Sequence, residues 1–216
     1  MDEIMYVKIG TAFKSEDMLS KWILGLAIVH NDLLTIKKKL QTTSRRRNID
    51  VQFQEYPSVI RLLASSLREA IFFLEESNKS TDIITYINSL PYEVKLKYEI
   101  LKSLFRDGKD SDLLQRLTNI RNITFHYSKP KRDELMVAIE SQKDSSFLFQ
   151  DDRDMFVFAD AVSNALMIQA LFSSEEINLE NKGNTKDIIF KINESFDTCI
   201  EFSKEIVQIY IKQTCG

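Results

Sequence analysis

The segment 15–43, SEDMLSKWILGLAIVHNDLLTIKKKLQTT, decides the fold, because its apolar residues recur every three or four positions. This spacing predicts a long helix with one face turned to a core. Ser15 is predicted as the N-cap, with Glu16 and Asp17 in the first turn, where the helix dipole favours negative charge. The stripe predicted to face the core is Met18, Trp22, Leu26, Val29, Leu33, Ile36 and Leu40.

The same spacing continues along the chain and predicts further helices. A second long helix is expected at about 57–78, with Pro57 at its start. Its inward residues are Ile60, Leu63, Leu67, Ile71 and Leu74. The remaining predicted helices cover 81–90, 91–106 (opened by Pro91), a helix capped by Asp110 or Ser111 and closed by Pro130, then 131–142, 154–173 and about 185–213.

Composition supports a helical protein. The 216 residues include five Gly and three Pro, the two residue types that punctuate turns and loops, and 44% are hydrophobic. We therefore predict an all-α helical bundle forming one domain over 1–216, with a bundle core at about 15–175 and a long C-terminal helix at about 185–213.

Charge and cysteine usage limit the classes of protein. A net charge of −3 is too small to attract nucleic acid by its overall field, so any such site must be a local patch. The two cysteines, Cys199 and Cys215, suit a reducing compartment. The acidic start MDEIMYVKIG does not resemble a signal peptide, and the apolar run 22–29 is shorter than the roughly 20 residues of a membrane span. A soluble, cytoplasmic protein that does not contact a membrane is expected.

The stretch NIRNITFHYSKP (119–130) carries the strongest functional signal, because it holds His126, one of only two histidines. On a helical wheel an apolar arc contains Leu113, Leu117, Ile120, Ile123, Thr124 and Tyr127, extended by Leu114 and Phe125. The polar row opposite consists of Gln115, Asn119, Asn122 and His126. Arg121 falls inside the apolar arc, where it needs a carboxylate, a phosphate or an acceptor from a second subunit.

Arg121 followed by a polar residue, with His126 five positions later on a helix of an all-α protein, resembles the R-x4–6-H motif of HEPN domains. The resemblance implies a HEPN-like antiparallel bundle with additional helices and a metal-independent endoribonuclease in a toxin or phage-defence system. It also implies a composite site at a homodimer interface, and an antitoxin or nucleotidyltransferase as a protein partner. Arg121 would bind the scissile phosphate, His126 would act as general acid or base, and Asn122 would orient the site.

The chemistry of this reading is coherent. RNA supplies its own 2′-hydroxyl nucleophile, so His126 would transfer the proton and Arg121 would hold the phosphate oxygens. On one ideal helix, however, the two residues lie about 140° apart, which favours a site shared between two copies. The alternatives are that Arg121 pairs with a buried carboxylate in a non-catalytic helical interaction module, or that the pocket belongs to a nucleotide-binding regulatory domain.

Other residues are candidates for supporting roles. His30 is expected to be a satisfied core histidine, with the alternative that His30 and Asp32 lie beside the motif helix. Basic residues that could follow an RNA backbone are Lys129, Lys131 and Arg132, and Arg45, Arg46 and Arg47 in KKKLQTTSRRR (37–47). Their alternative role is a solvated helix end or charged turn. In some HEPN proteins a tyrosine lies two residues after the histidine, whereas Tyr127 follows His126 directly, so its supporting role is open. No metal ligand set and no cofactor fingerprint is present.

Overall fold

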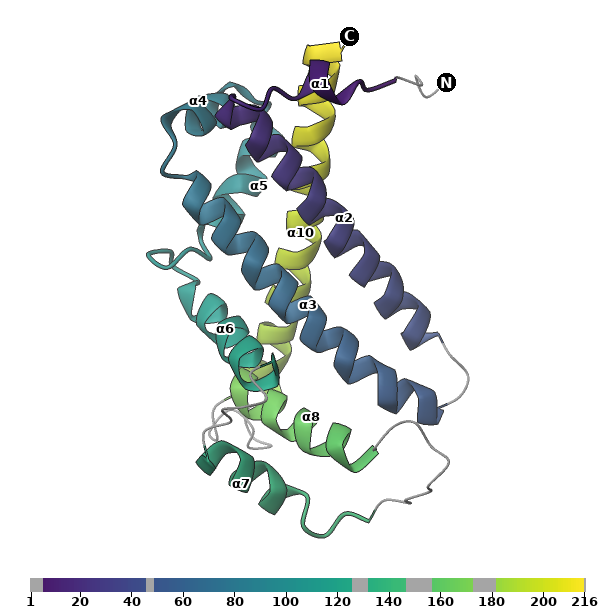
Figure 1. Ribbon diagram of the computed structural model, residues 1–216. Coiled ribbons are helices and arrows are strands. Elements are labelled where there is room, and N and C mark those ends of the chain that lie inside the picture. The colour runs from purple at the N-terminus through teal and green to yellow at the C-terminus, as the bar shows by residue number, and fades with distance from the viewer. Residues whose placement is uncertain (1–5, 46–48, 126–131, 147–156, 173–181, 216) are drawn as a thin grey trace. The chain divides into compact units, whose positions relative to one another are not determined.

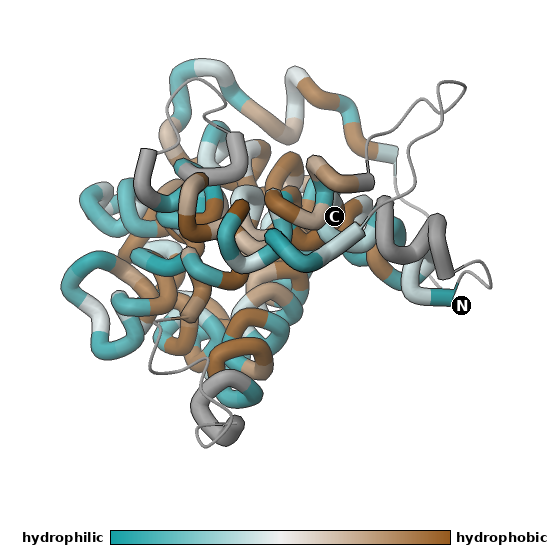
Figure 2. Tube along the Cα trace, turned by 90° about the horizontal axis from the view of Figure 1, so that it is seen from below, coloured by the Kyte–Doolittle hydropathy of each residue, from teal (hydrophilic) through white to brown (hydrophobic). Residues whose placement is uncertain are grey.

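The computed structural model describes residues 6–45, 49–125, 132–146, 157–172 and 182–215, and within these ranges the protein is all-helical, with no strands (Figure 1). Its helices are α1 (Ile9–Ala12), α2 (Met18–Ser44), α3 (Ile49–Ser77), α4 (Thr81–Ser89), α5 (Tyr92–Lys102), α6 (Ser111–Phe125), α7 (Arg132–Ser141), α8 (Val157–Leu171) and α10 (Lys182–Cys215). Each helix carries both hydrophobic and hydrophilic residues along its turns, as the brown and teal segments of Figure 2 show. The predicted all-α class is therefore confirmed.

The start of α2 corrects one prediction. The N-cap is Asp17 and not Ser15, because the Asp17 carboxylate accepts the backbone N–H of Ser20 at 2.9 Å. Ser15 instead donates its hydroxyl to Glu16 at 2.6 Å. An N-cap oxygen bonds an N–H two or three residues ahead, and Asp17 stands at that distance from the first turn of α2. The hydroxyl and N–H of Ser20 lower the pKa of Asp17 from its usual value.

The start of α3 corrects a second prediction. Pro57 lies inside α3, which already begins at Ile49. A proline removes only one backbone hydrogen bond from a helix, so turns on both sides of it can keep the helix continuous. The inward residues Leu63, Leu67, Ile71 and Leu74 are buried, as predicted, whereas Ile60 is half-buried.

The chain folds into two compact units, and α2, α3 and α10 contribute to both. Unit 1 comprises residues 1–35, 69–111 and 192–216. Its described core contains Trp22, Ile23, Leu26 and Leu33 of α2, Ile71 and Leu74 of α3, Ile83 and Ile87 of α4, Val94, Tyr98 and Leu101 of α5, and Phe196, Phe202 and Ile206 of α10. The ring of Tyr98 stacks on that of Phe202, with 5.6 Å between their centroids. Aromatic and aliphatic packing thus joins its helices.

Unit 2 comprises residues 36–68 and 112–191. Its described core contains Val59, Leu63 and Leu67 of α3, Leu113, Leu114, Leu117 and Ile120 of α6, Ala138 of α7, and Ala165, Leu166, Ala170 and Leu171 of α8. Helix α7 packs on α8, where Ala138 meets Ala165 and Leu166 (Figure 1). The prediction that all 216 residues form one domain stays a prediction.

Helix α2 differs from the prediction in two ways. Met18, predicted to face the core, is 54% exposed, whereas Ile23, outside the predicted stripe, is fully buried. Among the described residues α2 is also the one helix long and apolar enough to cross a membrane by length and composition. That is weak evidence for a span, because a core helix passes the same test, and Trp22 and Leu26 are buried within unit 1.

Candidate functional site

Helix α6 carries the motif and has the two faces that the sequence predicts. Leu113, Leu117 and Ile120 are buried, whereas Gln115 and Asn122 are exposed. The side chains of residues 123–127 lie outside the described part of the chain. The apolar arc is therefore confirmed over the first three turns of α6.

Arg121 lies between Leu114 and Leu117 on the helical wheel, within the apolar arc of α6. Its side chain is half-buried and follows the buried Ile120, and its guanidinium donates to the amide oxygen of Asn122 at 3.5 Å. The contact is at the long end of hydrogen-bond geometry, so it orients the guanidinium only weakly. The arrangement places an arginine and an amide side by side on the last described turn of the helix.

Several predicted site residues lie outside the described residues: His126, Tyr127, Lys129, Lys131, Arg46 and Arg47. Arg132 is the first residue of α7, and its side chain is not among those described. Arg45 follows the end of α2 and is exposed. The roles proposed for all these residues stay predictions.

His30 bonds the backbone of α10 within unit 1. Its Nδ1 lies 3.0 Å from the carbonyl oxygen of Ile200 and 3.5 Å from the hydroxyl of Ser203. A carbonyl oxygen can only accept, so Nδ1 must carry the hydrogen and donate it. His30 thus fits the expected satisfied core histidine. Asp32 is exposed on α2, and its supporting role stays a prediction.

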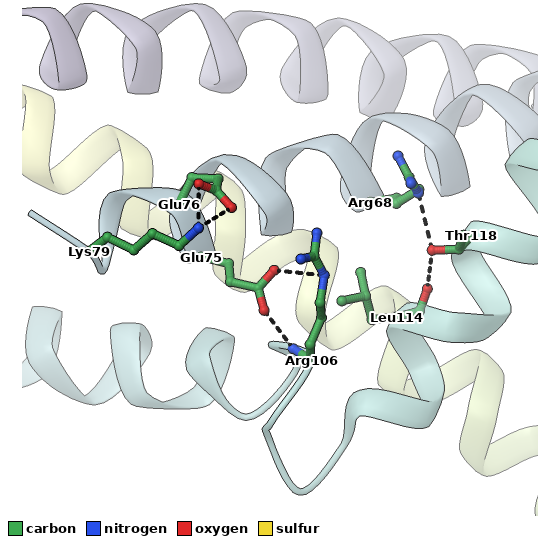
Figure 3. Close-up of polar contacts among 7 residues, drawn as sticks. All are labelled: Arg68, Glu75, Glu76, Lys79, Arg106, Leu114 and Thr118. Atoms are coloured by element: carbon green, nitrogen blue, oxygen red, sulfur yellow. Dashed lines mark hydrogen bonds and ion pairs between the residues drawn. The ribbon is translucent and has the colours of Figure 1, made fainter.

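Thr118 and Arg68 form a polar contact in unit 2 that the sequence did not single out. The Arg68 Nε donates to the Thr118 hydroxyl at 3.1 Å, and that hydroxyl donates to the Leu114 carbonyl at 2.8 Å (Figure 3). Because the Thr118 hydrogen is used on Leu114, the hydroxyl meets Arg68 as an acceptor. Thr118 lies three residues before Arg121 on α6, so both residues face the same side of that helix.

Arg61 forms a second polar cluster between α3 and α8. It donates to the hydroxyls of Ser163 and Ser58, the latter at 2.7 Å, and lies 3.9 Å from the Asp160 carboxylate. Burial raises the pKa of Asp160 above its usual range, and the nearby guanidinium of Arg61 partly opposes that shift. On α6, Arg116 donates to the carbonyl of Leu171. Unit 2 therefore anchors three arginines on neighbouring helices.

A sequence signal for these residues exists. Ser58, Arg61, Ser65 and Arg68 recur at i, i+3, i+7 and i+10, which places them in one polar stripe of α3 beside its apolar stripe. A polar stripe of that kind is usually a solvated face, so the sequence alone does not mark it as a site. Here the stripe is partly buried: Ser65 Oγ, together with Asn164 Oδ1 of α8, has no hydrogen-bond partner among the described residues.

Unit 1 contains a surface cavity of about 730 Å³ between the end of α3 and the loop after α5. The Glu75 carboxylate accepts the backbone N–H of Arg106 at 2.8 Å and lies 3.4 Å from its Nε (Figure 3). The Arg106 guanidinium also covers the ring of Phe72. Lys79 pairs with Glu76 at 2.7 Å in the same wall. Carboxylates of the wall bond these cations, so the cavity shows no preference for an anion or a cation.

Comparison with family models, with curated proteins and with solved structures gives no match to this chain. Its function must therefore be argued from its own residues. Among the described residues, α6 carries Arg121 and Asn122 and is contacted by Arg68 through Thr118, and guanidinium and amide groups are donors that can bind a phosphate.

Proposed function

We propose that this protein is a HEPN-like, metal-independent endoribonuclease with a composite site at a homodimer interface, acting in the cytoplasm as a toxin or phage-defence component. Arg121 would hold the scissile phosphate, Asn122 would orient it, and His126 would transfer the proton. The proposal is supported by the all-helical fold, which agrees with the fold that the resemblance implies.

One observation carries the proposal. Arg121 is half-buried at the end of α6, and Arg68 of a different helix is anchored on Thr118, one turn before it. Arginine gives bidentate contacts to phosphate oxygens, so an arginine at this place on the motif helix supports an anionic ligand such as the RNA backbone.

The direct test is incubation of purified protein with RNA in EDTA. His126→Ala is expected to lower the cleavage rate about 10²–10⁴-fold, because general acid–base catalysis contributes that much. Arg121→Ala is expected to lower it about 10²–10³-fold through lost stabilisation of the phosphate. The matched control is Arg106→Ala, which removes one positive charge from unit 1 and should cleave like wild type. Equal cleavage by wild type and His126→Ala, or none by either, would contradict the proposal.

A mixing experiment tests the composite site. If each site takes Arg121 from one copy and His126 from the other, mixing the inactive Arg121→Ala and His126→Ala proteins restores one intact site per mixed dimer. With random exchange, about a quarter of wild-type activity should return. Activity that stays at the level of the separate variants would place both residues of a site in one copy.

A non-catalytic helical interaction module is the second candidate. It is favoured by exposed apolar side chains in one row on α5, a helix of unit 1. If purified protein leaves RNA intact under all conditions yet associates through that row, this candidate replaces the nuclease.

A further inference from the structure

The outward face of α5 carries a row of large apolar side chains. Tyr92, Leu96 and Ile100 follow one another at i, i+4 and i+8 and are 71%, 49% and 39% exposed. The inner face of the same helix is anchored in unit 1 by Val94, Tyr98 and Leu101, which are all buried. An exposed apolar row on a helix that is already anchored by its other face indicates a contact with another molecule.

The charged residues beside this row are arranged symmetrically about Leu96. Glu93 lies three residues before Leu96 and Glu99 three residues after it, on opposite flanks of the row. Lys95 directly precedes Leu96 and Lys97 directly follows it, and these two lysines also lie on opposite flanks of the row. Both lysines lie farther around the helix from the row than the two glutamates do. Glu99 therefore shares a flank with Lys95, and Glu93 shares the other flank with Lys97.

We propose that α5 pairs with α5 of a second copy of this chain, antiparallel, about a two-fold axis beside Leu96. Leu96 then packs on its own equivalent, and Tyr92 packs on the partner's Ile100. Rotation about that axis keeps each flank on its own side, so Glu99 comes within about 3 Å, measured along the helix axis, of the partner's Lys95. Glu93 meets the partner's Lys97 in the same way on the other flank.

Charge complementarity and the helix dipoles identify the occupant. A second α5 supplies both an apolar row of the same length and lysines where the first presents glutamates, so the surface is complementary to itself. The antiparallel orientation sets the positive end of one helix beside the negative end of the other. Lys97 already pairs with Glu205 at 2.6 Å and Glu201 at 3.5 Å within its own chain, so the Lys95–Glu99 flank carries most of the charge complementarity.

The pairing goes beyond the proposed nuclease, because it uses none of Arg121, Asn122 or His126. One face of an 11-residue helix buries less area than the roughly 1,600 Å² of a standard interface. The association is therefore weak and depends on concentration.

The first experiment is sedimentation of the full chain over a series of concentrations. Leu96→Glu places two carboxylates on the axis and should raise the dimer Kd at least tenfold. The matched control is Ile28→Glu, because Ile28 is an exposed apolar residue of the same unit, on α2, with 56% of its surface exposed. This variant should associate like wild type. Both changes affect exposed positions, and thermal unfolding by circular dichroism would verify that both variants are folded.

The second experiment tests the orientation by charge reversal. Glu99→Lys and Lys95→Glu should each weaken self-association, because each brings like charges together on one flank. Mixing the two variants should restore association, since every Lys95–Glu99 contact across the mixed dimer again joins opposite charges. A parallel pair would not be restored, because Glu93 would then face the glutamate at position 95.

Three results would overturn the proposal. In the first, the wild-type protein stays monomeric up to millimolar concentration. In the second, the Leu96→Glu protein associates as well as wild type. In the third, the mixture of the two charge-reversed variants associates no better than either variant alone. The expected result is weakening by each single change and recovery in the mixture.

Discussion

Arg106 in unit 1 and Arg68 in unit 2 are both held by a side chain of another segment, but the chemistry differs. Glu75, a carboxylate, accepts the backbone N–H of Arg106 and pairs with its Nε at 3.4 Å. Arg68 donates to a neutral hydroxyl, that of Thr118. A carboxylate orients a guanidinium and cancels its charge, whereas a hydroxyl only orients it. Of these two contacts, the one in unit 1 is therefore a charge pair, and the one in unit 2 is a hydrogen bond to a neutral oxygen.

Both kinds of contact recur elsewhere in the chain, and unit 2 also holds charge pairs, among them Lys39–Glu55 at 3.2 Å and Lys143–Glu140 at 2.6 Å. In unit 1, Lys97 bonds Glu205 at 2.6 Å and its pKa is raised, chiefly by that hydrogen bond. In unit 2, Arg61 bonds two serine hydroxyls, and its carboxylate neighbour Asp160 stays 3.9 Å away. Charge pairs are screened by salt, and hydrogen bonds to neutral groups are not. A charge pair should therefore respond to ionic strength more strongly than a hydrogen bond to a neutral group.

The largest expected effect concerns the apolar core that each unit has. Phe202 is fully buried in unit 1 and stacks on Tyr98. Phe202→Ala should lower the free energy of unfolding by about 3–5 kcal/mol, through lost burial and the cavity left behind. Leu117→Ala should cost about 2–5 kcal/mol in unit 2. Urea unfolding measures both.

The control for Phe202 lies on the same helix. Phe190 is 66% exposed, and Phe190→Ala should change the free energy of unfolding by less than about 0.5 kcal/mol. A loss at Phe190 equal to that at Phe202 would mean that the core of unit 1 is wrongly identified.

The next effect tests the loop that follows α5 in unit 1. A Cβ added at Gly108 would lie 2.2 Å from the backbone oxygen of Ser103, a contact that a backbone atom cannot relieve without moving. Gly108→Ala should therefore cost about 1–3 kcal/mol. At Gly10 a Cβ meets nothing within 4 Å, so Gly10→Ala is the matched control and should be neutral or slightly stabilising. Equal stabilities of the two variants would contradict the close approach at Ser103.

Sequence spacing predicted the helices because local periodicity determines which face of a helix is apolar. Leu67, Leu117 and Ile120 were assigned to inner faces and are buried. Met18 was assigned in the same way but is 54% exposed, because the first turn of a helix can extend past its neighbours. Ser15 and Asp17 are both good N-cap residues, so composition could not decide which of them begins the helix.

The candidate site was predictable only in part. The helical wheel placed Arg121 among apolar residues, and its side chain is half-buried beside Ile120. The contact of Arg68 with Thr118 joins residues fifty positions apart, and it depends on how two helices pack rather than on local spacing. The catalytic role of Arg121 and His126 stays a prediction that the cleavage assay must decide.

The contrast in salt dependence is a smaller effect. Glu75→Gln should cost about 1–2 kcal/mol in dilute buffer, because a charge-assisted bond to Arg106 is lost. In about 1 M sodium chloride the salt screens this ion pair in the wild type as well, so Glu75→Gln should lower the free energy of unfolding by less than it does in dilute buffer. Urea unfolding at low and high salt measures the difference.

The matched variant in unit 2 is Thr118→Val, which removes the acceptor of Arg68 while keeping the shape of the side chain. Its cost should be about 0.5–1.5 kcal/mol and should not change with salt. If both variants showed the same salt dependence, the proposed difference between the Glu75–Arg106 and Arg68–Thr118 contacts would be wrong.

The smallest effect concerns pH and the N-cap of α2 in unit 1. Hydrogen bonds from the hydroxyl and N–H of Ser20 lower the pKa of Asp17, so the folded protein gives up this proton more readily than the unfolded chain. The stabilisation is complete above the ordinary aspartate pKa of 3.8 and is lost as pH falls through the lower, folded value. Asp17→Ala should cost about 0.5–1 kcal/mol at neutral pH. Unfolding curves should show that this cost stays constant down to about pH 5 and narrows below pH 4.

Asp17→Asn separates the cap from its charge. An asparagine oxygen caps a helix about as well as a carboxylate and does not titrate in this range, so the variant should stay close to wild type at neutral pH. Below pH 4 it should lose less stability than wild type, because it has no proton to gain. If wild type and Asp17→Asn showed parallel pH profiles, the hydrogen bonds from Ser20 would be as strong to a protonated Asp17 as to an ionised one. The acid sensitivity of unit 1 would then have to come from its other paired carboxylates. Glu76 is the next of these to test, because the hydrogen bond from Lys79 lowers its pKa.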